Sequence, residues 1–157
     1  MRSLGLLPFL LVVAAQLAAQ APNSEREAVL APVHQLFDGM RKGDSAAVRR
    51  AFHPEAFLAT ALMRQGKPTL QVDTLDAFLR VVGTPHDEVW DERLHGEKVE
   101  IDGPLASVWT EYSFYAGGKF SHCGVDAFQL AKTSEGWRII ALTDTRRREG
   151  CPQEQAP

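Results

Sequence analysis

The feature that most constrains this chain is a change of pattern near residue 89. Before it, apolar residues recur at helical spacing between short turn signals. After it, long segments rich in β-branched and aromatic residues alternate with tight turns: Asp102-Gly103-Pro104, Gly117-Gly118 and Ser134-Glu135-Gly136. Strands joined by such short turns pair antiparallel. Helices followed by an antiparallel meander belong to the α+β class, in which the helices bury their apolar stripes on one face of the sheet.

Capping and turn signals divide the chain into helices and strands. Ser24 and Glu27 form a capping-box pattern that predicts the start of the first helix, and Gly43 predicts its end. Either Asp44 or Ser45 caps a short second helix. The other predicted elements are short strands over 57–62 and 69–72, a helix over 75–82 that is capped by Asp73 or Thr74 and ends at Gly83, and strands over 93–101, 105–115, 120–131 and 137–145.

The N-terminal segment has the pattern of a secretory signal peptide. Arg2 is the only charge before Glu25, and the apolar run over 4–15 is too short to span a bilayer. We expect cleavage after Ala19; the alternatives are a later cut in the same small-residue stretch, or an uncleaved anchor helix. We therefore expect an exported protein, periplasmic or secreted and without a stable membrane anchor, divided into a signal peptide over 1–19, a domain over 24–147 and a C-terminal tail over 148–157.

Export bears on the two cysteines of the chain, Cys123 and Cys151. An oxidising compartment permits a disulfide between them, and closing so long a loop would stabilise the fold by roughly 3 kcal/mol. The alternative is two unpaired thiols, one of them buried in a strand.

Charge and motifs exclude several classes of function. The chain holds 20 acidic and 17 basic residues, a net charge of −3, which does not favour nucleic acid or an anionic membrane surface as a partner. Its histidines and cysteines lack metal-ligand spacing, so we expect no metal site. The sequence contains no glycine-rich nucleotide-binding motif, and we expect no cofactor.

Several short motifs, in their order and spacing, give the chain a family resemblance. It resembles nuclear transport factor 2-like domains of the SnoaL-like type over residues 25–147, through Gly43-Asp44, Phe52-His53-Pro54, Ile101 with Gly103, Asp126 to Leu130, Gly136-Trp137 and Ile139-Ile140. The resemblance implies a cone-shaped, curved antiparallel sheet wrapped around N-terminal helices, a cystatin-like roll with an internal pocket. The family includes isomerases, dehydratases, polyketide cyclases, epoxide hydrolases and binding proteins, so function must be argued from the pocket residues.

The last two predicted strands place a polar group on one face of the sheet. If the turn at 134–136 carries a glycine bulge, Thr133 pairs with Trp137, Leu130 lies opposite Ile140, and Asp126 lies opposite Asp144. His122 and Arg146 then lie on the same face as the two aspartates. Gly124, between His122 and Asp126, leaves open space there, which favours a pocket.

This polar group permits two interpretations. In the first interpretation, two opposed carboxylates repel, so that one keeps its proton. A protonated carboxyl beside a histidine suits acid–base catalysis, with His122, Asp126 and Asp144 as the catalytic residues. Tyr112 or Tyr115 would then donate to an oxyanion. In the other interpretation, Arg146, Arg147 and Arg138 pair with the aspartates in a salt-bridged sheet end. The candidates for ligand contact are Tyr112, Phe128, Phe114, Trp90 and Arg146.

The opposite face of the sheet also carries apolar side chains, among them Trp109, Val125, Ala127 and Ile139. A second copy of the chain would cover this face, so we expect a homodimer; the alternative is that these residues stay half-exposed.

These observations favour an exported domain that binds a small apolar or weakly polar molecule. The alternatives are a cofactor-independent isomerase, dehydratase or hydrolase with a His/Asp acid–base pair, and a dimerising accessory domain without a ligand.

Overall fold

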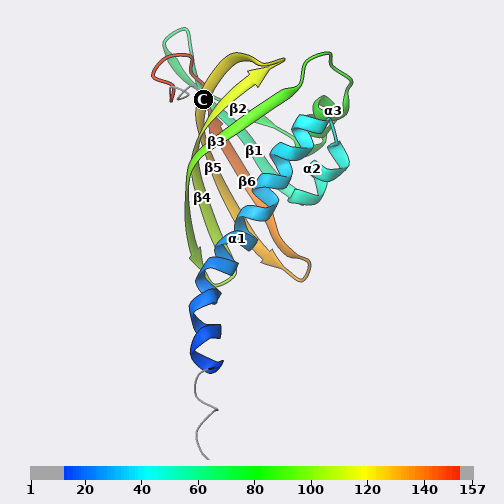
Figure 1. Cartoon of the computed structure of the whole chain (residues 1–157). Coiled ribbons are helices and arrows are strands. Elements are labelled where there is room, and N and C mark those ends of the chain that lie inside the picture. Colours follow the sequence, from blue (N-terminus) through cyan, green and yellow to red (C-terminus); the bar gives the residue numbers. More distant parts are fainter. Residues whose placement is uncertain (1–12, 153–157) are drawn as a thin grey trace, which may run out of the picture.

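The structure, a computed structural model, describes residues 13–152, with side chains from residue 24 onward. Figure 1 shows a strongly curved sheet with the helices on one side of it. The elements in chain order are α1 (Val13–Lys42), α2 (Ser45–Ala51), β1 (Phe52–Arg64), β2 (Lys67–Asp73), α3 (Leu75–Gly83), β3 (Trp90–Asp102), β4 (Leu105–Ala116), β5 (Lys119–Thr133) and β6 (Gly136–Thr145).

The six strands form one sheet in the order β2-β1-β6-β5-β4-β3. Strands β3 to β6 make the predicted antiparallel meander, and β1 pairs in parallel with β6. The chain therefore brings its first and last strands together in the middle of the sheet, with the β1–β2 hairpin beyond them. This arrangement confirms the predicted α+β class.

Helix α1 differs from the prediction at its start. It begins at Val13 instead of Ser24, and its first turns project beyond the sheet (Figure 1). The stretch over 14–21 is rich in alanine, the residue with the highest helix propensity, so the helical backbone continues through the predicted cap. Residues 1–12 of the predicted signal peptide and 153–157 of the predicted tail lie outside the described residues. Across residues 13–152, none of the helices combines the length and apolar character that a membrane span requires.

The predicted caps of the later helices are confirmed. Gly43 takes a positive φ of 65° after the end of α1, a conformation that glycine adopts without strain. Asp44, not Ser45, caps α2, because its Oδ1 accepts a hydrogen bond from the Ala47 backbone N–H at 2.9 Å. Thr74 caps α3 in the same way through the Ala77 N–H at 3.1 Å. These caps turn the chain twice at one end of α1, which gathers α2 and α3 there.

The β5–β6 pairing corrects the predicted register near the turn. Thr133 pairs with Gly136 and Leu130 with Ile139, whereas we predicted Trp137 and Ile140 as their partners. An irregularity between Gln129 and Leu130 then shifts the register by one residue, as a β-bulge does. Beyond it, the predicted pairs hold: Phe128 lies opposite Leu142, and Asp126 opposite Asp144.

The same bulge corrects the predicted outer face of the sheet. Ile139 is fully buried in the core between helices and sheet, not on the outer face. Trp109 is 53% exposed, and Val125 and Ala127 are half-buried, so these three remain on the uncovered side. The core itself consists of apolar residues from α1, α2, α3 and the inner sheet face, including Val29, Val33, Leu36, Val48, Leu79, Val82, Val108, Phe128 and Leu130.

Phe128 provides a direct test of this core. Its side chain is 1% exposed and packs edge-on against Phe37, with the ring centroids 6.2 Å apart. We expect Phe128→Ala to lower the free energy of unfolding by about 3–5 kcal/mol, because it leaves a cavity in the core. Phe120, which is 46% exposed on the same strand, is the matched control, and Phe120→Ala should cost less than about 1 kcal/mol. Chemical denaturation measures both, and equal losses would contradict the described packing.

Candidate functional site

A cavity of about 520 Å³ lies between the helices and the inner face of the sheet. This volume is within the range of small-molecule sites in proteins, roughly 300–1,000 Å³. Its helical wall is apolar and comes from Leu36, Phe37 and Met40 of α1 and Ala77, Phe78 and Val81 of α3. The strands contribute aromatic side chains and nearly all of its polar groups. The cavity is therefore apolar along one wall and polar at one end.

Three polar residues line this end where the sequence predicted them. His122, Asp126 and Asp144 all reach the cavity, because the β5–β6 register puts them on the inner face of the sheet. Arg146 follows β6 and lines the cavity beside them. Of the predicted ligand contacts, Trp90, Tyr112 and Phe114 also line it. Phe128 does not, because it packs in the core.

Glu92 is a site residue that was not predicted from the sequence. We predicted that the strand starts at residue 93, whereas β3 begins at Trp90, and this extension brings Glu92 into the sheet opposite Phe114 of β4. The signal that was available is alternation: Trp90, Glu92 and Leu94 share one face of the strand, so a glutamate stands between two inward-facing apolar residues. Thr60, Gln71 and Asp73 of the β1–β2 hairpin also line the cavity without having been predicted.

The carboxyl groups of Glu92 and Asp126 form a hydrogen-bonded pair. Two carboxylates contain no donor, so the hydrogen bond requires that one of the two groups holds a proton. Burial raises the pKa of Glu92 to about 7, although part of the residue's surface remains accessible. Burial, together with the neighbouring Glu92, also raises the pKa of Asp126 well above its ordinary value. Near neutral pH the pair therefore keeps at least one proton, and the two groups titrate as a unit.

Asp126 is enclosed more completely than its partner. Its residue surface is 2% exposed, and its Oδ2 has no hydrogen-bond partner in the described part of the chain. An unsatisfied buried oxygen is costly to the fold, so it marks a position where a hydrogen-bond donor would be favourable.

Arg146 pairs with the other aspartate of the site. Its Nε donates to Asp144 Oδ2 at 2.8 Å, and its Nη2 donates to Thr60 Oγ1 at 3.3 Å. The predicted salt-bridged end therefore exists for Asp144, whereas Asp126 pairs with Glu92. The other two arginines go elsewhere: Arg138 bridges to Glu135, and Arg147 is held by its backbone against Cys123.

The two tyrosines named as oxyanion donors have other partners. Tyr112 donates its hydroxyl to the Thr145 carbonyl at 2.9 Å, and burial raises its pKa well above the ordinary value. Tyr115 does not line the cavity; its ring lies under the Arg93 guanidinium, 4.3 Å from the ring centroid. Tyr112 thus offers its ring to the cavity, while its hydroxyl is held by the Thr145 carbonyl and lies 3.5 Å from Asp144 Oδ2.

His122 is a neutral aromatic neighbour of the carboxyl groups. Its ring stacks on Phe114 at 5.0 Å between centroids and meets Tyr112 edge-on at 5.8 Å. Its Nδ1 lies 3.1 Å from Ser121 Oγ. Burial, with a contribution from the nearby Arg146, lowers the pKa of His122 below its usual 6.5, so the imidazole is uncharged at neutral pH.

Gly124 has a different role from the predicted one. The space beside it is filled: a Cβ here would overlap the carbonyl oxygen of Thr145 and lie 2.7 Å from a ring carbon of Tyr112. Any side chain at this position would displace the backbone that leads from Asp144 to Arg146. Glycine is therefore needed so that the end of β6 can approach β5 closely.

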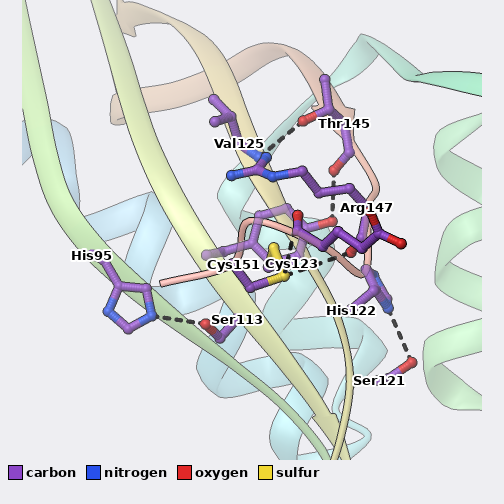
Figure 2. The surroundings of a disulfide bond; sticks show 11 residues. His95, Ser113, Ser121, His122, Cys123, Val125, Thr145, Arg147 and Cys151 are labelled. Atoms are coloured by element: carbon purple, nitrogen blue, oxygen red, sulfur yellow. Dashed lines mark hydrogen bonds between the residues drawn. A yellow bond between two sulfur atoms is a disulfide. The ribbon is translucent and has the colours of Figure 1, made fainter. Parts of the chain in front are cut away.

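A disulfide between Cys123 and Cys151 holds the segment that follows β6 (Figure 2). The two Cα atoms are 5.7 Å apart. Cys123 and Arg147 exchange two backbone hydrogen bonds, of 2.9 and 2.8 Å, and Val125 donates to Thr145 Oγ1 at 3.1 Å. These contacts hold the chain on both sides of Arg146 against β5, and so they position the Arg146 side chain at the cavity.

Comparison with known proteins identifies the family of this chain. The family model described as "Putative lumazine-binding" matches residues 24–143, most of the chain. The chain belongs to this family. No curated protein matches it.

Solved structures share the fold of this family member at low sequence identity. A nuclear transport factor 2-like protein with a cystatin-like fold from Novosphingobium aromaticivorans is 13% identical with a TM-score of 0.68, covering 90% of this chain and 94% of that one. A protein of unknown function from Silicibacter pomeroyi is 22% identical with a TM-score of 0.55, covering 80% and 98%. A "putative dehydratase" from Streptomyces avermitilis is 16% identical with a TM-score of 0.59, also covering 80% and 98%.

These likenesses confirm the nuclear transport factor 2-like fold that the sequence motifs predicted. The SnoaL-like subtype stays a prediction. Neighbours of unknown function and one with an enzyme's description share the same architecture, so the cavity residues must carry the functional argument.

The raised pKa of Glu92 makes stability depend on pH. The folded state holds this proton more tightly than the unfolded chain, so its stabilising effect is complete below about pH 4.5 and is lost as the pH rises through about 7. We expect the free energy of unfolding to fall over that window and Glu92→Gln to reduce the fall, as measured by denaturation at several pH values. The lowered pKa of His122 makes stability rise with pH, and it does so in both the unmodified protein and Glu92→Gln. The difference between their two curves of stability against pH therefore reports the Glu92 carboxyl.

The exposed Glu111 on β4 does not line the cavity and is the matched control. Glu111→Gln should leave the pH dependence as it is in the unmodified protein. If the free energy of unfolding fell with pH as far in Glu92→Gln as in the unmodified protein, the shared-proton pair would be contradicted.

Proposed function

We propose that this protein is an exported domain that binds a small molecule with an apolar body and one polar group. The observation that carries the proposal is the cavity of about 520 Å³, with an apolar helical wall and a polar end where a buried carboxyl oxygen has no partner. Such a combination, mostly apolar walls with a few convergent polar groups, is typical of ligand sites. The apolar wall would bind the body of the ligand, and the polar end would orient it.

The proposal of export rests on two features. The apolar segment over 4–15 has the length of a signal-peptide core. The disulfide between Cys123 and Cys151 is of the kind that persists in an oxidising compartment outside the cytosol.

The family description makes lumazine a natural first probe. A planar heterocycle of this kind would lie against the aromatic side chains of the cavity, Trp90 and Phe114, and would present ring N–H groups to the carboxyl pair. A neutral aromatic alcohol such as naphthylmethanol tests the apolar wall without relying on the family description.

Proton transfer is a second candidate function, favoured by the Glu92–Asp126 pair. A carboxyl pair with one shared proton contains a donor and an acceptor beside a ligand, which suits an isomerase, dehydratase or hydrolase without a cofactor. His122 is neutral and lines the same cavity, so it is available as a proton acceptor. Chemical change of a bound ligand on prolonged incubation, lost in both Asp126→Asn and His122→Ala, would distinguish catalysis from binding alone.

We also propose that two copies associate through the outer face of the sheet. Trp109, Phe57, Met63, Leu70 and Val72 are exposed, more large apolar surface than isolated surface positions usually show. Light scattering on Trp109→Glu tests this pairing: a dimer that the substitution dissociates supports it, and a monomeric unmodified protein contradicts it. An accessory domain that dimerises without a ligand would show the dimer and bind neither probe.

Filling the cavity gives the sharpest test of binding. Ala77 of α3 lines the cavity, and Ala77→Phe places a ring in the space that the ligand would occupy. We expect this variant to lose binding of naphthylmethanol and lumazine by more than about tenfold, measured by fluorescence titration. Ala31 is exposed on α1, so Ala31→Phe is the matched control and should bind as the unmodified protein does. Binding of neither probe by the unmodified protein, or equal binding by Ala77→Phe, would contradict the proposal.

A further inference from the structure

The charged groups that line the cavity are unbalanced in sign. Four carboxyl groups face it, from Asp73 of β2, Glu92 of β3, Asp126 of β5 and Asp144 of β6. Arg146 is the only arginine or lysine among the lining residues that the structure describes. His122 also lines the cavity but is uncharged at neutral pH, because burial lowers its pKa.

The single arginine does not neutralise this set. Its Nε is committed to Asp144 at 2.8 Å. Glu92 and Asp126 keep at least one proton between them near neutral pH, so the pair adds at most one negative charge. Asp73 accepts a hydrogen bond from the neutral Gln71 amide at 3.0 Å and adds another charge. At neutral pH the cavity thus carries an excess of negative charge, with apolar side chains on its opposite wall.

The aromatic side chains near the carboxyls also favour a positively charged ligand. Trp90, Tyr112 and Phe114 line the cavity at the end where Glu92 lies. The faces of aromatic rings attract cations through their quadrupole. Asp126 Oδ2 is buried, has no partner and is an acceptor, so a group that donates hydrogen bonds would satisfy it.

We propose that the ligand of this cavity is an organic cation, a protonated amine on an apolar or aromatic body. This inference rests on the proposed binding function and names the charge of the ligand's polar group. The ammonium group would lie beside Glu92 and Asp126, with Asp73 adding its charge to the same cavity, and the body would contact the side chains of α1 and α3. A carboxylate or phosphate ligand is disfavoured, because it would bring like charge to a site of low dielectric.

Three probes with the same ring system separate charge from apolar contact: naphthylmethylamine, naphthylmethanol and naphthoate. Titration calorimetry near neutral pH measures each dissociation constant. We expect the amine to bind about tenfold more tightly than the alcohol, and naphthoate to bind most weakly. Equal or tighter binding of the alcohol, or tightest binding of naphthoate, would overturn the cation inference while leaving the cavity a binding site. Binding of none of the three would overturn both.

Substitutions test whether the carboxyls of the cavity cause the preference for the amine. Asp73→Asn and Glu92→Gln each remove a lining carboxyl and should reduce the ratio of amine to alcohol affinity by about threefold. Glu111→Gln makes the same change in charge outside the cavity and should leave the ratio as in the unmodified protein. Alcohol binding in each variant shows that it is folded. A ratio that is the same in all three variants would overturn the assignment of the ammonium group to this end of the cavity.

Discussion

The hydrogen bond between the carboxyl groups of Glu92 and Asp126 is the interaction on which the site depends. It forms only while the pair keeps a proton, and burial keeps that proton in place near neutral pH. Ionising both groups would leave two adjacent negative charges beside the core. The surrounding structure gathers the pair from distant parts of the sequence: β3 supplies Glu92, β5 supplies Asp126, and both line the cavity that α1 and α3 help to enclose.

The other features of the cavity follow from holding the strand ends close to this pair. Gly124 lets the end of β6 approach β5, and the Tyr112 hydroxyl fastens that end through the Thr145 carbonyl. The disulfide and the backbone bonds of Arg147 then fix the chain beyond it. As a result, Arg146 stays with Asp144 and does not neutralise Asp126. Glycine, disulfide and tyrosine therefore act together to hold the chain around Arg146, so that its guanidinium lies beside Asp144.

The strands and helices that surround this site could be predicted from the sequence, because they depend on local signals. Turn residues and alternation were enough for the strands, and caps such as Thr74 for the helices. The pairing of Asp126 with Asp144 was predicted through two errors that cancel: a wrong partner for Thr133 at the turn, and an unforeseen register shift between Gln129 and Leu130. A bulge depends on packing across the whole sheet, so no local pattern reveals it. That bulge also moved Ile139 from the predicted outer face into the core.

Glu92 was missed for a related reason. It stands at the start of a strand, where boundaries are least certain, and its partner Asp126 is 34 positions away in the chain. Gly124 was interpreted as open space because sequence shows the absence of a side chain but not which backbone approaches it. Such non-local contacts give the polar end its chemistry, and the fold shared with distant neighbours does not determine them.

Infrared spectroscopy of the carboxyl groups tests the shared proton most directly. At a pH just below 7 the ordinary carboxyls of the protein are ionised, so a C=O stretch from a protonated carboxyl reports the Glu92–Asp126 pair. We predict that this band is present in the unmodified protein and absent from the double variant Glu92→Gln/Asp126→Asn, in which neither buried carboxyl remains. Absence of the band from the unmodified protein, or its persistence in the variant, would contradict the central claim.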